Sequence, residues 1–174
     1  MSITISYTSR EEIAVHKFSW VAALGVPLLA LLLQTFLARP FRFITIFDLP
    51  LLVTIFFGVA RRRPITGLIT GALIGSVQDY LAGVYAGLNG IAKTIIGYFA
   101  SSLGLRLDVE NPGSRFLMTF VFYLMHQVIY TAIDIVLVGG KGVPNWGRVL
   151  LSAFANGLLA VPLFSLLDRL KIRG

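Results

Sequence analysis

The chain contains no cysteine among its 174 residues. Disulfide frameworks, thiol catalysis and cysteine-ligated metals are therefore excluded. Charged residues are also scarce, because they make up only 13% of the chain, about half the share found in a soluble domain. Hydrophobic residues make up 56%. This composition is typical of a membrane protein.

The net charge of +7 could indicate a nucleic-acid partner, but the basic residues lie in short loops and near the termini rather than on one face. In a membrane chain this pattern indicates topology. No nucleic-acid partner is expected, and no sequence motif for a phosphate-binding loop, a metal centre or another cofactor site is present.

Six apolar segments are long enough, or nearly so, to cross a bilayer as helices of about 20 residues. We therefore predict an all-α integral membrane protein with six transmembrane helices in one membrane domain, residues 18–174, preceded by a polar leader, residues 1–17. The second and third segments are short and could be tilted or partly interfacial. The predicted segments are 18–37, 44–60, 65–82, 86–103, 116–138 and 149–167.

Basic residues are distributed unequally between the two sets of connections. If the N-terminus is cytoplasmic, ten basic residues lie inside and four outside, with Lys93 in a helix. This excess predicts that both termini face the cytoplasm. The inside residues are Arg10, Lys17, Arg61, Arg62, Arg63, Arg106, Arg115, Arg169, Lys171 and Arg173, and the outside ones are Arg39, Arg42, Lys141 and Arg148. The cytoplasmic groups Arg61, Arg62, Arg63 and Arg169, Lys171, Arg173 are expected to contact anionic lipid headgroups or a cytoplasmic filament.

Small residues recur at helical spacing in the third and fourth segments. Gly67, Gly71 and Gly75 follow one another every four residues, and Gly90 and Gly97 give the fourth segment a similar face. Such faces let two helix backbones approach closely. The five glycines are predicted to pack helices together within the chain, or alternatively against a helix of a partner.

A few polar and ionisable side chains fall inside the predicted helices, mostly in the outer half of the membrane: Asp48, Asp79, Asn89, Lys93, His126 and Asp134. Each is costly if it faces lipid and is expected to face the bundle interior or a polar cavity. We predict that Lys93 pairs with Asp79, and with Asp134 as a further partner, to hold the helices together. The alternatives are a ligand pocket open to the outside, a catalytic role, and snorkelling to the interface.

Catalysis is not expected. Asp79 and Asp134 could in principle form an aspartyl dyad, but the neighbours expected of a lipoprotein signal peptidase are missing. Ser76 with His126 could mimic a serine dyad, yet Ser76 has no G-x-S-x-G setting. His126 is expected to be a hydrogen-bonded interior histidine, because no second histidine lies at ligand spacing.

The run GLITGALIGSVQDYLAGVYAGLNGIAKTIIGY resembles the central signature of the rod-shape-determining MreD family, in which a glycine-rich helix ends in an aspartate before a glycine-containing turn. The run ANGLLAVPLFSLLDRL is similar to the last helix of that family. The positions that carry the resemblance are Asp79, Gly83, Gly87, Tyr98, Asn156, Gly157 and Pro162.

The resemblance implies a non-catalytic subunit of the cell-elongation machinery, or elongasome, in the bacterial cytoplasmic membrane. It implies transmembrane contact with MreC, and through MreC with the MreB filament and the peptidoglycan synthase formed by RodA and penicillin-binding protein 2. It also implies a fold similar to the S components of energy-coupling-factor vitamin transporters. An S component is therefore the alternative, although Leu28, Leu31 and Leu32 stand where its first helix would need small residues.

Overall fold

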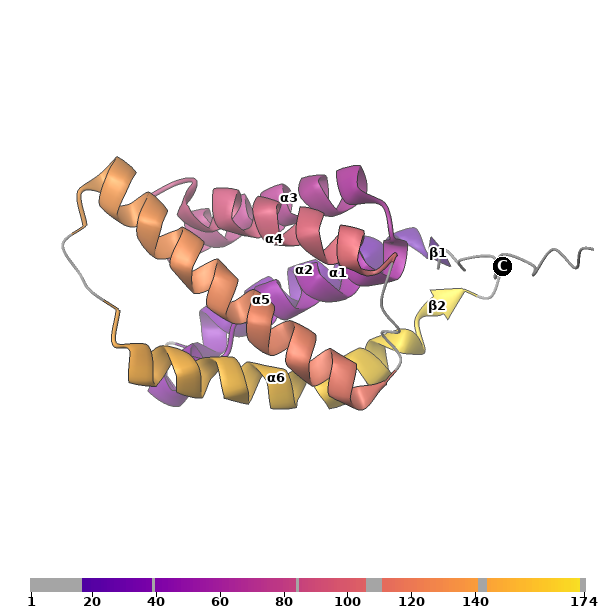
Figure 1. Cartoon of the computed structure of the whole chain (residues 1–174). Coiled ribbons are helices and arrows are strands. Elements are labelled where there is room, and N and C mark those ends of the chain that lie inside the picture. The colour runs from indigo at the N-terminus through magenta and orange to yellow at the C-terminus, as the bar shows by residue number, and fades with distance from the viewer. Residues whose placement is uncertain (1–16, 39, 84, 106–110, 141–143, 173–174) are drawn as a thin grey trace, which may run out of the picture.

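The computed structural model describes residues 17–38, 40–83, 85–105, 111–140 and 144–172. Apart from the connecting turns, these residues form helices and one pair of two-residue strands (Figure 1). The elements in chain order are β1 (Lys17–Phe18), α1 (Trp20–Ala38), η1 (Arg42–Ile46), α2 (Leu49–Arg61), α3 (Pro64–Ala82), α4 (Leu88–Leu103), α5 (Pro112–Ile133), η2 (Asp134–Val138), α6 (Trp146–Asp168) and β2 (Lys171–Ile172). The prediction of an all-helical architecture is confirmed.

Within the described ranges, four segments are long and apolar enough to cross a membrane: Trp20–Leu37, Phe43–Arg61, Pro112–Val138 and Trp146–Asp168. α3 and α4 are not among them. α4 has only 16 residues, and α3 carries Gln78 and Asp79 besides its glycines. Because these two helices bury part of their polar surface against each other, they need less apolar surface than helices that face lipid. Six transmembrane spans stay a prediction.

The predicted segment 44–60 corresponds to the membrane-length segment Phe43–Arg61, but it is not one continuous helix. The segment begins as a 3-10 turn, η1, and α2 starts only at Leu49 and runs for 13 residues. Asp48 is the reason for the break, since its side chain accepts a hydrogen bond from the Leu51 amide at 3.0 Å. Pro50 in the first turn also favours a helix start at this point. α2 is therefore about 20 Å long, at 1.5 Å per residue.

The fifth helix begins earlier than predicted, at Pro112 instead of residue 116. Asn111 caps it by accepting a hydrogen bond from the Gly113 amide at 2.8 Å. An asparagine followed by a proline is a strong signal for a helix start. It accounts for the earlier start of this helix. The helix ends in the wider π-helical turn η2, where a regular helix was expected to reach residue 138.

α2 forms the centre of the bundle. Every residue from Pro50 to Ala60 is buried, as expected for a helix that is apolar on all sides. Near its C-terminal end, Phe56 and Phe57 meet Phe18 of β1 and Phe164 of α6 in edge-on and tilted ring contacts. The first and last helices thus share one core with α2.

α3 and α4 pack with almost no side chain between them. A Cβ placed on Gly67, Gly71 or Gly75 would overlap the α4 backbone at Gly97, Lys93 or Asn89 respectively, and a Cβ on Gly97 would overlap Gly67. Gly90 lies against Ser76 and Asp79. All five predicted packing glycines therefore lie between α3 and α4, which is the first of the two alternatives raised by their spacing.

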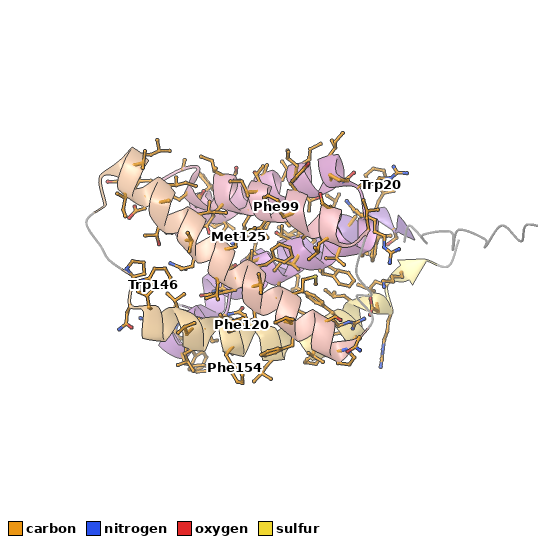
Figure 2. The ribbon with its side chains drawn as sticks, in the orientation of Figure 1. Trp20, Phe99, Phe120, Met125, Trp146 and Phe154 are labelled. Carbon is orange, nitrogen blue, oxygen red and sulfur yellow. The ribbon has the colours of Figure 1, made fainter. Side chains whose placement is uncertain are left out.

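Both ends of the described chain lie at the same end of the bundle (Figure 1). β1 and β2 pair antiparallel, with Lys17 opposite Ile172 and Phe18 opposite Lys171. At the periphery, large apolar side chains point outward along the helices, and Trp20 and Trp146 lie at opposite ends of the bundle (Figure 2). Tryptophan at both ends is typical of helices that meet two membrane–water interfaces.

Candidate functional site: a buried polar centre

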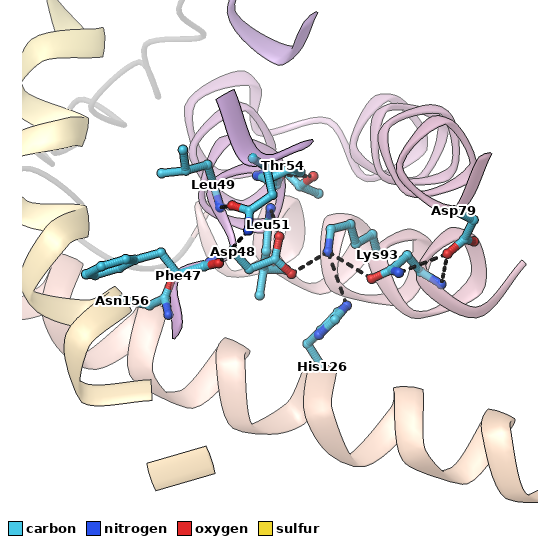
Figure 3. Close-up of polar contacts among 12 residues, drawn as sticks. Phe47, Asp48, Leu49, Leu51, Thr54, Asp79, Lys93, His126 and Asn156 are labelled. Carbon is cyan, nitrogen blue, oxygen red and sulfur yellow. Dashed lines mark hydrogen bonds and ion pairs between the residues drawn. The ribbon is translucent and has the colours of Figure 1, made fainter. Parts of the chain in front are cut away.

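The polar centre consists of Asp48, Asn89, Lys93, His126 and Asn156, with Asp79 beside it. Figure 3 shows Lys93 between Asp48 and His126. Lys93 is its focus, and its side chain is completely buried. The ammonium nitrogen Nζ lies 2.7 Å from Asp48 Oδ2 of the α2 cap. It also lies 3.3 Å from Asn89 Oδ1, one turn earlier on α4, and 3.3 Å from His126 Nε2 on α5. Lys93 therefore joins its own helix, α4, to the start of α2 and to α5.

A lysine ammonium has three N–H donors and no acceptor. The three neighbours of Lys93 supply three acceptors, so that each donor has one partner. For this to hold, His126 Nε2 must carry no proton, and the neutral ring must hold its proton on Nδ1. The prediction that His126 is a hydrogen-bonded interior histidine agrees with this geometry, since the residue is 4% exposed.

Asp48 is placed by the break between η1 and α2. One carboxylate oxygen caps α2 and the other binds Lys93. The backbone N–H of Asp48 donates to Asn156 Oδ1 of α6 at 2.9 Å, and Asn156 Nδ2 donates to the Ile46 carbonyl at 2.8 Å. Gln34 of α1 holds the same segment by donating to the Phe47 carbonyl and accepting from the Leu49 amide. The helix break is therefore tied to α1 and α6.

Asp79 does not pair with Lys93, which corrects the main contact predicted from the sequence. Its carboxylate accepts hydrogen bonds from the backbone amides of Gly87, Asn89 and Gly90 at 2.9–3.1 Å, and from Asn89 Nδ2 at 2.9 Å. The first amides of a helix have no partner within the helix, and a carboxylate stabilises them best. Asp79 at the end of α3 thus serves the start of α4.

Asp134 is not part of the polar centre, which corrects its expected role as a further partner of Lys93. Instead it lines a separate crevice of about 550 Å³, together with Gly83, Tyr85, Leu88 and Tyr130. Neither this crevice nor a second one at the same end of the bundle is lined by Asp79 or Lys93. The structure therefore lends no support to the alternative of a pocket formed by Asp48, Asp79, Lys93 and Asp134 together.

Two amide side chains that hold the centre in place were not predicted to do so from the sequence: Asn156, which belongs to the centre, and Gln34, which lies beside it. In the sequence, Asn156 stands out only through the resemblance to a family. The residue type could have indicated this role, because an amide side chain within an apolar helix has to find hydrogen-bond partners. Both amides supply such partners to the backbone around Asp48.

The hydrogen bonds and the ion pair of the polar centre join helices to one another. Ser76 is exposed on α3, and no hydrogen bond among the described residues joins it to His126. Within the same part of the chain, no three His, Asp or Glu side chains form a group that could hold a metal ion. Buried polar atoms without a partner occur there at Arg62, Gln78 and Thr119, all outside the polar centre.

The basic residues predicted to contact headgroups or a filament differ in their exposure and in their contacts. Arg61 lies 5.1 Å from the Phe57 ring, and Lys171 pairs with Asp168 at 2.7 Å. Arg63 and Arg169 are exposed and Arg62 is half-buried, whereas Arg173 lies outside the described residues. Arg115 is buried and pairs with Asp168, and it donates to Ser165 at 2.9 Å.

The fold and the polar centre define a helical membrane protein whose interior charges join its own helices. The family model for rod shape-determining protein MreD matches residues 15–170. The chain therefore belongs to the MreD family, as its resemblance predicted, and its role lies in rod-shape determination. Comparison with curated proteins and with solved structures gave no match.

Proposed function

We propose that the chain is a multi-pass, non-catalytic scaffold subunit of the cell-elongation complex in the bacterial cytoplasmic membrane, where it binds MreC. The observation that carries the proposal is the MreD family match over residues 15–170. The polar centre supports it, because Lys93 has a partner for each of its donors and lines neither of the two crevices at its end of the bundle. A substrate site would instead present such groups to a cavity.

The proposed topology has six spans, with both termini in the cytoplasm. It is supported by the β1–β2 pair, since two chain ends on one side require an even number of crossings. The excess of basic residues toward that end, including Arg61, Arg62 and Arg63, supports its assignment to the cytoplasm. The central position of α2 supports a single membrane domain for residues 18–174, with residues 1–17 as its leader.

MreC would be contacted through helix faces that are apolar and exposed in the isolated chain. The glycine face of α3 is not available, because α4 covers it. Of the long helices, α1 and α5 are the least buried, with 17% and 11% of their membrane-length segments inside the protein. A transmembrane helix of MreC would replace lipid on one of these faces through van der Waals packing.

Through MreC, the chain would be linked to MreB and to RodA with penicillin-binding protein 2. The exposed Arg63 and Arg169 lie where anionic lipid headgroups of the cytoplasmic leaflet would meet them, as would the half-buried Arg62. The S-component alternative is less well supported, since Leu28, Leu31 and Leu32 stand on α1 where small residues would be needed for docking.

The proposal is tested by purifying the tagged protein from its native host in mild detergent, with mass spectrometry of co-purifying proteins and of extracted small molecules. Recovery of MreC together with the elongation synthase, without a stoichiometric small molecule, is the expected result. Recovery of transporter ATPases or of a bound vitamin would overturn the scaffold proposal in favour of the transporter alternative.

The contacted helix can be located with two matched variants. Gly25→Leu adds bulk to α1 at a position where a new Cβ meets nothing within 4 Å. Ala132→Leu does the same on an exposed position of α5. Loss of MreC from only one of the two variants identifies the helix. Retention of MreC by both would place the contact elsewhere on the protein.

A further inference from the structure

A second crevice, of about 350 Å³, opens at the end of the bundle opposite the β1–β2 pair. The ribbons of α5 and α6 separate toward this end (Figure 1), and η1 closes a third side. We name it the α5–α6 crevice. It is lined by Thr45, Tyr123, Gln127, Pro144, Asn145, Arg148, Val149 and Ser152. It shares no residue with the polar centre.

The lining presents polar and apolar surface in nearly equal parts and contains no acidic side chain. Six of the eight residues carry hydroxyl, amide or guanidinium groups, and Arg148 is the only formally charged one. Ser152 and Val149 are buried at 4% and 8% exposure, whereas Arg148, Asn145 and Thr45 are exposed. The crevice therefore has a closed floor and an open, positively charged rim.

Two groups in the crevice have unused hydrogen-bonding capacity. Arg148 donates to Thr45 Oγ1 at 3.2 Å, and none of the ion pairs among the described residues includes it. The side-chain amide of Gln127, on membrane-length helix α5, makes no hydrogen bond to any residue in the described ranges. A glutamine at such a position is costly unless it meets a polar partner.

We propose that the α5–α6 crevice binds the phosphate group of an anionic phosphate ester. Guanidinium and phosphate match in charge and geometry and form paired, charge-assisted hydrogen bonds. Gln127 and one hydroxyl group of the hydrogen-bonded pair Tyr123 and Ser152 supply neutral donors around the same anion. Trp146, half exposed beside Asn145, marks the depth at which membrane headgroups lie. The ligand is a phospholipid headgroup or a soluble phosphate ester with the same chemistry.

The test uses the full-length protein in detergent micelles containing phosphatidylglycerol, with native mass spectrometry of the retained lipid. Arg148→Gln and Gln127→Leu each remove one proposed contact. We expect Arg148→Gln to weaken retention about tenfold, the factor for one charge-assisted hydrogen bond, and Gln127→Leu to weaken it by a smaller factor. Phosphatidylcholine has the same phosphodiester, but its choline group offsets the negative charge, so its retention should be weaker and should depend less on Arg148.

The matched control is Gln78→Leu, which removes a half-buried amide from α3, outside the lining of the crevice. Circular dichroism and gel filtration establish that each variant is folded. Glycerol 3-phosphate separates the two ligand sources. If it displaces the lipid, the crevice takes soluble phosphate esters as well, and if it does not, the site is specific for a headgroup. Equal retention by Arg148→Gln, Gln127→Leu and Gln78→Leu would overturn the proposal.

Discussion

The Asp48–Lys93 ion pair should make a larger energetic contribution than any other side-chain contact in the bundle. Its atoms are 2.7 Å apart, which corresponds to roughly 6 kcal/mol of Coulomb attraction at an effective dielectric constant of about 20. Desolvation offsets much of this attraction, but removing one partner leaves the other charge buried at a cost of about 3–5 kcal/mol. Asp48→Asn should cost more than Lys93→Met, because the Lys93 side chain is 0% exposed and that of Asp48 is 15% exposed.

The assay is a double-mutant cycle on the free energy of unfolding, measured by circular dichroism as sodium dodecyl sulfate is added to mixed micelles. The double variant Asp48→Asn, Lys93→Met should lose less than the sum of the single losses, with a coupling energy of about 2 kcal/mol or more. A parallel cycle with Asp79→Asn and Lys93→Met is the control, and its coupling should be smaller since no ion pair joins these residues. Additivity within about 0.5 kcal/mol in the first cycle would refute the assignment of Lys93 to Asp48.

Three further predictions use the same unfolding assay. Gly71→Ala should destabilise the protein by about 1–3 kcal/mol through overpacking against the α4 backbone, whereas Gly25→Ala, which meets nothing within 4 Å, should be neutral or stabilising. Asn156→Ala should cost about 1–3 kcal/mol, because it leaves the Asp48 amide and the Ile46 carbonyl without partners; an unchanged value would show that water replaces the amide. Asp79→Ala removes the acceptor of four hydrogen bonds at the start of α4 and should cost about 3 kcal/mol or more. A smaller loss for Asp79→Ala than for Asn156→Ala would contradict the capping role.

The positions of the helices follow from hydropathy, and the ends of α1, α3, α4 and α6 lie within three residues of the predicted ones. The starts of α2 and α5 were predicted less accurately, and both differences have the same cause. At Asp48 and at Asn111 a capping side chain followed by a proline starts a helix at a definite residue. Hydropathy cannot register this signal, because it averages over many residues.

The partner of Lys93 could not be predicted from spacing alone. Asp79 is the nearest carboxylate in the sequence, but its hydrogen bonds go to the amides at the start of α4. Asp48 reaches Lys93 only because the η1–α2 break brings it over α4, and that contact spans 45 residues of the chain. Long-range pairing depends on the fold, whereas the need of each buried charge for some partner can be read from the residue type.

The β1–β2 pair has a mechanical consequence. It links the segment before α1 to the segment after α6. A protein that binds residues 1–16 and pulls on them would therefore exert force on α6 as well as on α1. A tether at this point would act on the whole bundle at once, through the aromatic contacts between Phe18 and α2.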